Sequence, residues 1–383
     1  MKSPLRAPKL TVLFGVDTCH HGHVRKRSAT SHDVARLAGV SRATVSLVLN
    51  RKPGATISES TRTRVLEAAR KLDYHINAAG RSLRSQRTGT VGLIVRRPHG
   101  LSSDAFLPRV LEGIGSVLGP AGRRLLIEPL DPDHPISYMS LVREGYVDGL
   151  IFSDARADDV SLGALHDDGV PIVLWGQLPK SDLPFVDIDN AAAAQIAVEH
   201  LIGLGHRRIA CITNAHLGQE RRAAGERLRG YRIALTAHGL PVDESLVRYG
   251  DYEEQSGFEA MRSLLTGDAR PSAVFVASDE VALGALRAIR EAGLHVPQDL
   301  AIVGFDDIPI SRLVMPALTT IRLPARQIGV VAATMLTETL DGGRRPDSVL
   351  LETELIVRES SGGPVAAIAE PVAAAQLVAE ATT

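Results

Sequence analysis

Two groups of side chains have residue types that could bind a metal ion or transfer protons. The run CHHGH at residues 19–23 contains one cysteine and three histidines, which are zinc ligands in many proteins. Adjacent side chains close poorly on one metal ion and no distant second pair accompanies them, so a flexible leader is the alternative. Asp306 and Asp307 resemble paired acid and base groups, but neighbouring side chains at a strand end point apart. We therefore expect neither a metal site nor an enzyme.

Residues 30–50, TSHDVARLAGVSRATVSLVLN, predict two short helices joined by a tight turn. Thr30 can cap the first helix and Ser41 the second, and Gly39 suits a turn conformation that a Cβ would oppose. One face of each helix carries apolar residues at helical spacing, namely Val34, Ala35, Ala38, Val45, Val48 and Leu49. This pattern indicates a helix-turn-helix, whose second helix enters the DNA major groove. An ordinary helical corner is the alternative.

The polar face of the second helix and the positive charge around it indicate that DNA is the partner. Arg42, Ala43 and Ser46 point away from the apolar face, and Arg42 can donate two hydrogen bonds to guanine. Residues 24–90 contain 14 Lys and Arg against 4 Asp and Glu, whereas residues 91–383 contain 26 against 39. The formal net charge of −1 hides this asymmetry. A basic head on an acidic body fits a polyanionic partner at one end only.

Ser58 can cap a third helix, so residues 30–76 form one helical DNA-binding module. The apolar face of that third helix is expected to consist of Val65, Leu66, Ala69 and Leu72. Residues 77–89 are basic and small except for Leu83, and a helix there would form only on docking to DNA. Leu83 could then act as a wedge in the minor groove. A plain linker is the alternative, because Gly80 disfavours a helix by about 1 kcal/mol relative to alanine.

From Thr90 onward, short buried strands alternate with helical patterns, and the whole series occurs twice. The first series of expected strands is TVGLIV, RRLLIEPL, VDGLIFS, PIVLWG and FVDID. This alternation predicts doubly wound parallel sheets, which bind ligands at the carboxyl ends of their strands. The expected fold is an all-α helix-turn-helix head followed by an α/β body of two lobes with a cleft between them.

Cellular context is constrained by three further features. Cys19 and Cys211 are too few for a disulfide framework and fit a reducing cytoplasm. No apolar run is long enough to span a bilayer. The first 19 residues resemble a signal peptide only weakly, because a small-x-small cleavage site is missing. The main alternative, a solute-binding or sensor protein with the same two-lobed body, would need export and would not need residues 30–88.

The sequence resembles the LacI-type (lactose/galactose repressor) family of transcription regulators over about residues 30–360. The matching segments are DVARLAGVSRATVSLVLN, TRTRVLEAARKLDY, NAAGRSLRS, EHLIGLGHRRIACI, RLRGYRIAL, GDYEEQSGFEAM, PSAVFVASDEVALGALRAIREAGLHVPQDLAIVGFDDI and PALTTIRLP. The resemblance implies a homodimeric repressor that binds a pseudo-palindromic operator through a helix-turn-helix head and a hinge helix. It also implies a periplasmic-binding-protein-like body that binds a small effector, a sugar or nucleoside-like molecule, and no cofactor.

The same resemblance implies roles for individual residues in the head. It places Arg42 and Ala43 at base edges with Leu47 near them, and Thr44 and Ser46 at the DNA backbone. The remaining residues expected at the DNA interface are Thr30, Ser41, Asn50, Asn77, Ala78 and Leu83.

In the body, the resemblance implies effector contacts from Arg227, Tyr252, Ser278, Asp279 and Asp306. This set suits a polyol, because Arg227 offers a fork of donors, Asp306 accepts hydroxyl hydrogens and Tyr252 can lie against an apolar sugar face. The alternatives are that Arg227 lies on a solvated helix face and that Asp279 is a helix cap.

The expected domain boundaries follow from these patterns. They are a flexible extension over 1–29, the DNA-binding domain over 30–76, a hinge over 77–89 and the two-lobed body over 90–360. Within the body, the first lobe is expected over about 90–187 and 321–345, and the second over about 188–320 and 346–360. Residues 361–383 lack the leucine heptads of a tetramerising helix and are expected to form a disordered tail, which leaves a dimer.

Overall fold

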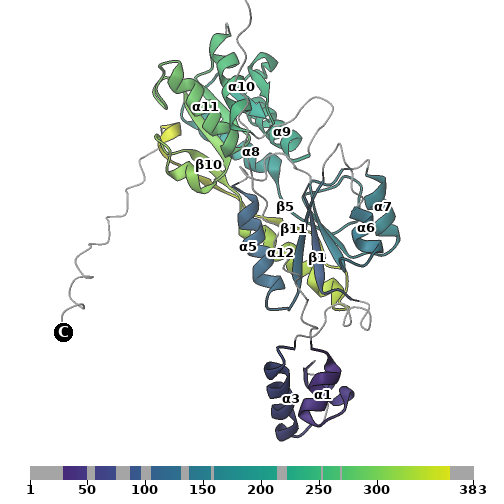
Figure 1. Ribbon diagram of the computed structural model, residues 1–383. Coiled ribbons are helices and arrows are strands. Elements are labelled where there is room, and N and C mark those ends of the chain that lie inside the picture. Colours follow the sequence, from purple (N-terminus) through teal and green to yellow (C-terminus); the bar gives the residue numbers. More distant parts are fainter. Residues whose placement is uncertain are drawn as a thin grey trace, which may run out of the picture. The chain divides into compact units, whose positions relative to one another are not determined.

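The structure is a computed structural model that describes residues 29–49, 57–74, 87–95, 105–130, 138–156, 159–213, 222–251, 253–267 and 270–362. The chain divides into two compact units, residues 1–81 and 82–383. Figure 1 labels many of the helices and some of the strands of the two units.

The described residues of the first unit, or head, form three helices: α1 (Ser31–Ala38), α2 (Arg42–Leu49) and α3 (Glu59–Lys71). The predicted caps are present. Thr30 and Asp33 form a reciprocal capping box, and Ser41 Oγ accepts the Thr44 amide at 3.1 Å. Gly39 ends α1 in the left-handed region, with φ 64°. Local chemistry therefore fixes both ends of α1 and the start of α2, which sets the angle between the two helices.

The core of the head differs from the prediction at one position. Leu66 is 45% exposed, whereas Ala68 is only 3% exposed and packs inside. The buried face of α3 repeats at Val65, Ala68, Ala69 and Leu72, a spacing of three and four residues, and Leu66 lies one position off that face. The prediction that Leu66 belongs to the core was therefore wrong.

Two six-stranded sheets form the second unit, or body, and they give the two predicted lobes. The first sheet has the order β11-β5-β4-β3-β1-β2 and the second β12-β10-β9-β8-β6-β7. All pairs are parallel except β10 with β12. The strands of the first sheet are β1 (Thr90–Val95), β2 (Arg124–Pro129), β3 (Gly149–Ser153), β4 (Ile172–Trp175), β5 (Phe185–Ile188) and β11 (Val349–Leu351). Those of the second are β6 (Ile209–Thr213), β7 (Val247–Tyr249), β8 (Ala273–Val276), β9 (Ala301–Asp306), β10 (Thr319–Arg322) and β12 (Glu354–Ile356).

Helices cover both faces of each sheet (Figure 1). In the first lobe, α5 (Leu107–Leu118) and α12 (Ala325–Leu340) pack on one face, and α6 (Tyr138–Arg143) and α7 (Val160–Asp167) on the other. In the second lobe, α8 (Asn190–Gly203) and α9 (Arg222–Ala237) lie opposite α10 (Glu254–Thr266) and α11 (Asp279–Glu291). Successive residues of a strand serve opposite faces, so central strands such as β8 are buried throughout. Short 3-10 helices occur at Glu244–Leu246 (η1), Pro309–Arg312 (η2) and Glu359–Ser361 (η3).

Strand β2 departs from the prediction of a buried strand. Its residues are exposed or half-buried because β2 forms the edge of the first sheet, with β1 as its single neighbour there. An edge strand keeps one row of backbone groups and part of its side chains in water.

The described chain passes between the lobes at three places, and two of the expected boundaries need correction. β10 lies wholly in the second sheet, so the first lobe resumes after residue 322 and not at 321. β11 pairs with β5, so residues 349–351 belong to the first lobe, where the prediction assigned 346–360 to the second. The predicted tail also begins too early, because Ser361 is 2% exposed and its Oγ lies 2.9 Å from both His200 Nε2 and Thr319 Oγ1.

Glycines allow close approach of paired helices in the body. In the α10–α11 pair, a Cβ on Gly284 would lie 1.8 Å from the Glu254 carbonyl oxygen, and one on Gly257 would lie 2.0 Å from the Val281 oxygen. The α5–α12 pair has the same arrangement at Gly113 and Gly329. Any side chain at these positions would push the two backbones apart.

We expect Gly284→Ala to destabilise the body by about 3 kcal/mol, because the α10–α11 interface must separate to admit the methyl group. Gly115→Ala is the matched control, since Gly115 also sits inside a helix and no group outside that helix lies within 4 Å of the place that its methyl group would take. The control should be neutral or stabilising by up to about 1 kcal/mol. Chemical denaturation of the two variants measures both effects, and equal stabilities would contradict the close-approach explanation.

Candidate functional site

The two lobes enclose a cleft that is lined by the carboxyl ends of strands from both sheets. β1, β3, β4 and β5 contribute Val95, Ser153, Trp175 and Ile188 from the first lobe, and β9 contributes Asp306 from the second. Strand ends from both sheets therefore meet at one place, which is where doubly wound sheets bind ligands.

Arg227 on α9 is held rigidly at the wall of this cleft and is only 7% exposed. Its Nε donates to Asn190 Oδ1 at 2.9 Å, and its Nη1 donates to the Ala277 carbonyl at 2.6 Å. The guanidinium carbon lies 3.8 Å from the centre of the Phe305 ring, and Nη1 is 3.6 Å from Asp306 Oδ1. Arg227 therefore does not lie on a solvated helix face, and its planar fork is fixed before any ligand binds.

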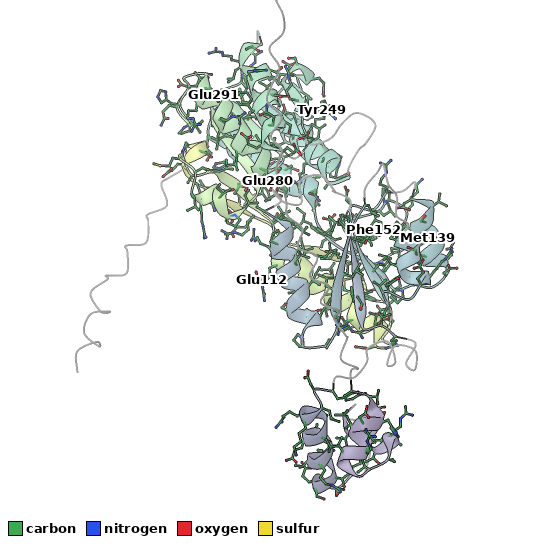
Figure 2. All side chains as sticks on the ribbon, viewed as in Figure 1. Glu112, Met139, Phe152, Tyr249, Glu280 and Glu291 are labelled. Carbon is green, nitrogen blue, oxygen red and sulfur yellow. The ribbon has the colours of Figure 1, made fainter. Side chains whose placement is uncertain are left out.

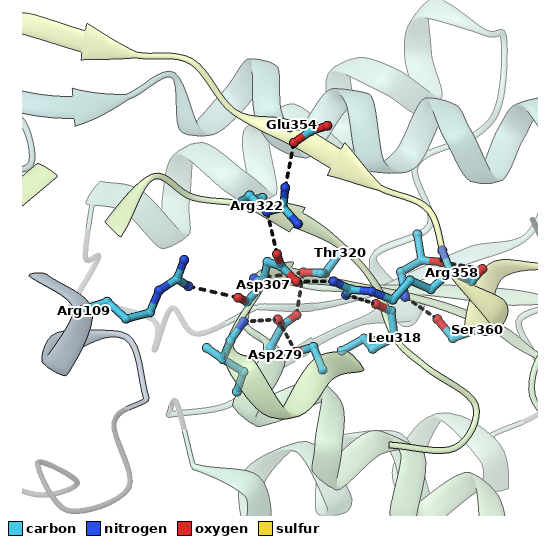
Figure 3. Close-up of polar contacts among 12 residues, drawn as sticks. Arg109, Asp279, Asp307, Leu318, Thr320, Arg322, Glu354, Arg358 and Ser360 are labelled. Atoms are coloured by element: carbon cyan, nitrogen blue, oxygen red, sulfur yellow. Dashed lines mark hydrogen bonds and ion pairs between the residues drawn. The ribbon is translucent and has the colours of Figure 1, made fainter. Parts of the chain in front are cut away.

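The carboxylates of Asp306 and Asp307 point apart, as predicted. Asp306 faces Arg227 in the cleft, whereas Asp307 accepts hydrogen bonds from Arg322 at 2.7 Å and Arg358 at 2.6 Å (Figure 3). Burial alone would raise the pKa of Asp307, but the hydrogen bonds from Arg358 and Arg322 outweigh it and hold that pKa below its ordinary value. The two groups have different partners and do not form an acid–base pair.

Asp279 was predicted to contact the effector or, alternatively, to cap a helix, and the structure places it in neither position. The N-cap of α11 is Ser278, and Asp279 is the first residue of the helix. Its side chain is fully buried, while its neighbours Ser278 and Glu280 line the cleft. Desolvation, helped by the nearby charge of Asp306, raises the pKa of Asp279 to about 7. Asp279 is therefore neither the capping residue nor a residue of the cleft surface.

This raised pKa has a measurable consequence for stability. Between the ordinary value of 3.8 and about 7, the folded chain keeps a proton on Asp279 that the unfolded chain releases. The stability that Asp279 contributes is therefore greatest below pH 4 and is lost as the pH rises through 7. Relative to Asp279→Asn, we expect the wild type to lose about 2 kcal/mol of unfolding free energy between pH 5 and pH 7. Denaturant titrations across this range test it, and a pH-independent difference would refute it.

Several residues of the cleft were not predicted from the sequence. Phe106 and Trp175 stack with ring centroids 5.8 Å apart and form an aromatic wall. Asp187 accepts hydrogen bonds from Gln177 at 3.1 Å and from Asn190 at 3.3 Å, and burial raises its pKa. One signal in the sequence could have found these residues, namely their position at or just after the ends of expected strands. It applies to Trp175, Gln177, Asp187 and Asn190.

Among the described residues, two hydrogen bonds join the start of α5 to the second lobe beside the cleft. The Ala105 amide donates to Glu280 Oε1 at 2.8 Å, and Arg109 Nη1 donates to the Asp307 carbonyl at 3.0 Å. Figure 2 shows that the Glu280 end of α11 faces the first lobe, while Glu291 marks the opposite end. The start of α5 is thus attached to the second lobe at two points.

The head presents the predicted DNA-binding residues of α2 on its surface. Ser41, Arg42 and Ala43 are exposed, and Thr44, Ser46 and Leu47 are half-buried. Thr30 is exposed and engaged in its capping box, while Ser41 caps α2. The other predicted site residues, Asn50, Asn77, Ala78, Leu83 and Tyr252, and the cluster at 19–23, lie outside the described residues.

Neither a metal-binding cluster nor a membrane-spanning helix occurs among the described residues. These residues include no group of three or more His, Cys, Asp or Glu side chains able to hold a metal ion. In the same parts of the chain, no helix has the length and apolar character needed to cross a membrane.

A helix-turn-helix head joined to a two-lobed body with a ligand cleft defines a ligand-responsive DNA-binding regulator. Sequence comparison agrees: residues 30–77 match the bacterial regulatory proteins of the lacI family, and residues 198–361 match a periplasmic binding protein-like domain. The chain belongs to the lacI family of transcription regulators.

Full-length relatives support this assignment. The HTH-type transcriptional regulator CelR of Thermobifida fusca is 37% identical over 345 residues, which cover 88% of this chain and 99% of CelR. Catabolite control protein A of Priestia megaterium is 36% identical over 82% of this chain and 93% of its own length. The predicted fold class is confirmed as well.

Solved structures resemble most of the chain. A complex of CelR with cellobiose has a TM-score of 0.67 and 36% identity, and covers 87% of this chain and 99% of that one. The lac repressor dimer bound to operator and the anti-inducer ONPF has a TM-score of 0.75 and 26% identity, and covers 88% and 99%.

Proposed function

We propose that this regulator represses genes by binding a pseudo-palindromic operator as a homodimer, and that an uncharged sugar in the cleft changes its operator affinity. The observation that carries the proposal is the buried Arg227, fixed beside Asp306 at the cleft wall. The CelR–cellobiose complex and the operator-bound lac repressor dimer support a sugar effector and a dimeric DNA complex.

The chemistry of the cleft suits a polyol. Arg227 and Gln177 supply donors, Asp187 and Asp306 supply acceptors, and Trp175 adds an aromatic surface. A sugar has hydroxyl groups that need both donors and acceptors, and a C–H face that packs on an aromatic ring. Because these polar groups are already oriented by one another, binding costs little side-chain ordering.

Charge narrows the effector class further. Among the described residues that line the cleft, four carry carboxylates and one carries a cation: Asp154, Asp187, Glu280 and Asp306 against Arg227. Asp306 and the Ala277 carbonyl already engage that cation. A phosphorylated or carboxylated sugar would meet net repulsion, so the cleft favours an uncharged one.

The head supports operator binding through the exposed N-terminal end of α2. Arg42 is exposed there, where a second helix of this motif meets base edges. Residues 77–89, including Asn77, Ala78 and Leu83, are proposed to act as the hinge, with Leu83 inserted into the minor groove. Two heads in a dimer would read two half-sites, so we expect the operator to be pseudo-palindromic.

The test combines two measurements on the full chain. Thermal-shift assays with cellobiose, glucose, maltose, glucose 6-phosphate and adenosine report binding, and fluorescence anisotropy with DNA from the upstream region of its own gene reports operator affinity. We expect an uncharged sugar to raise the melting temperature and to change operator affinity about 5-fold or more. Stabilisation by glucose 6-phosphate or adenosine alone, or by none of the five compounds, would overturn the assignment of the effector class.

A further inference from the structure

The turn at residues 306–308, which begins with the last residue of β9, holds two consecutive residues in the left-handed region. Asp306 has a φ of 116° and Asp307 a φ of 50°. Residues with a Cβ disfavour this region, and they stay in it only where their surroundings impose it. The turn carries Asp306 into the cleft, so whatever imposes its conformation also determines where the Asp306 carboxylate lies.

The Asp279 carboxylate lies directly behind this turn and accepts three hydrogen bonds. Its Oδ2 accepts from the Ile308 amide at 3.0 Å and from Ser311 Oγ at 2.6 Å, and its Oδ1 accepts from Thr320 Oγ1 at 2.7 Å. The three donors come from the turn, from η2 and from β10. One side chain at the start of α11 therefore joins the turn, η2 and β10 (Figure 3).

The fold leaves room for this carboxylate. A Cβ on Gly304 would lie 2.2 Å from Asp279 Oδ1, so only glycine fits at that position of β9. All three donors are uncharged, and Asp279 is fully buried. Taking a carboxylate out of water with only neutral donors around it is costly, so apolar packing in its place would stabilise the fold at least as well.

The turn also has contacts on its other side. Arg322 and Arg358 bind the Asp307 carboxylate, and Arg109 from the first lobe donates to the Asp307 carbonyl. Arg227 faces the Asp306 carboxylate at 3.6 Å. The turn at residues 306–308 thus presents the Asp306 carboxylate to the cleft and the Asp307 carbonyl to Arg109 of the first lobe. Asp279 holds the turn from the inner side through the Ile308 amide.

We propose that Asp279 is a positioning residue of the effector site, which holds the turn at residues 306–308 so that Asp306 meets the effector together with Arg227. The proposal rests on the proposed function of the cleft. Asp279 acts through the Ile308 amide and the turn, and it does not touch the effector itself.

The first test needs no effector. At about pH 8.5, above the raised pKa of about 7, Asp279 is a carboxylate, and Asp279→Asn keeps the size of that side chain but cannot accept all three hydrogen bonds. Ser360→Ala is the matched control, because Ser360 is also buried and hydrogen-bonded in the second sheet but contacts the Thr319 amide and the Ile302 carbonyl, not the turn. Amide hydrogen exchange should increase at 305–309 in the Asn variant, beyond any change elsewhere in the lobe. Unchanged protection at the turn, or the same increase in the control, overturns the proposal.

The second test measures affinity for cellobiose by calorimetry in a double-mutant cycle. Asp279→Asn alone should weaken binding roughly tenfold or more, and Ser360→Ala should not, even when both variants melt at similar temperatures. In an Asp306→Asn background, Asp279→Asn should add little further loss, because its effect passes through Asp306. Full additivity of the two losses overturns the positioning role.

The two tests separate this inference from the function on which it rests. If the wild type does not bind cellobiose but hydrogen exchange changes at the turn in the Asn variant alone, the choice of sugar is wrong and the positioning of the turn stands. If cellobiose binds equally to the wild type and Asp279→Asn, the sugar assignment stands and the positioning role is refuted.

Discussion

Replacing Arg227 with alanine is expected to remove the effector response while leaving operator binding within about threefold of the wild type. Arg227 donates to Asn190 and faces Asp306 at 3.6 Å, so its removal takes the cation out of the cleft wall. Losing hydrogen bonds from a buried cation costs about 1.5–3 kcal/mol, which corresponds to a loss of effector affinity of about 10-fold or more. Operator binding should persist because these contacts of Arg227 lie within the body.

Arg229→Ala is the matched control for this experiment. Arg229 lies on the same helix two residues later, but its side chain is 56% exposed and pairs with Glu226 at the surface. Exposed pairs of this kind contribute little, so the effector affinity of this variant should equal that of the wild type. Operator titrations with and without the effector measure both variants. If Arg227→Ala responded like the wild type, the effector would have to bind elsewhere.

The second large effect is expected from Arg42→Ala in the head. Arg42 is the first residue of α2 and is exposed, which allows a bidentate contact with a guanine at the major-groove edge. Losing one such contact costs about 1–3 kcal/mol, so operator affinity should fall about 5- to 150-fold. Affinity for a scrambled duplex should fall far less, because that complex depends on phosphate contacts.

Arg70→Ala distinguishes base contacts from general charge. Arg70 lies near the end of α3, is exposed and carries the same charge as Arg42. It should weaken binding to operator and scrambled DNA by the same small factor, if at all. Anisotropy titrations against both duplexes at one salt concentration give the comparison. Equal losses on both duplexes for Arg42→Ala would mean that this side chain does not read sequence.

The features of the head that were predictable from the sequence are local. Thr30, Ser41 and Ser58 cap helices through contacts with residues three positions ahead, so their roles follow from short spacings. The alternation of strands and helices in the body was predictable for the same reason. Leu66 was wrongly assigned to the core because Val65 and Leu66 lie four and three residues before Ala69, so spacing allows either side chain on the buried face of α3. Only packing in the folded head decides between them.

The cleft depends on contacts between distant segments, which spacing cannot reveal. Arg227 meets Asn190 and Asp306, 37 residues before it and 79 after it. The resemblance to a family indicated Arg227 and Asp306, but not that Phe106 and Trp175 stack across the first lobe. Asp279 was misread because its type and place fit a cap, whereas only the fold shows that three donors surround it.

The functional proposal as a whole requires that the basic head bind operator DNA and that a ligand in the body control this binding. Its decisive measurement is the affinity for DNA from the upstream region of the protein's own gene, compared with a scrambled duplex between about 50 and 200 mM salt. We expect tighter binding to the upstream fragment, a steep loss of affinity with salt on both duplexes, and a shift when a stabilising sugar is added. Equal affinity for the two duplexes at the lowest salt, unchanged by every sugar that stabilises the protein, would refute the proposal.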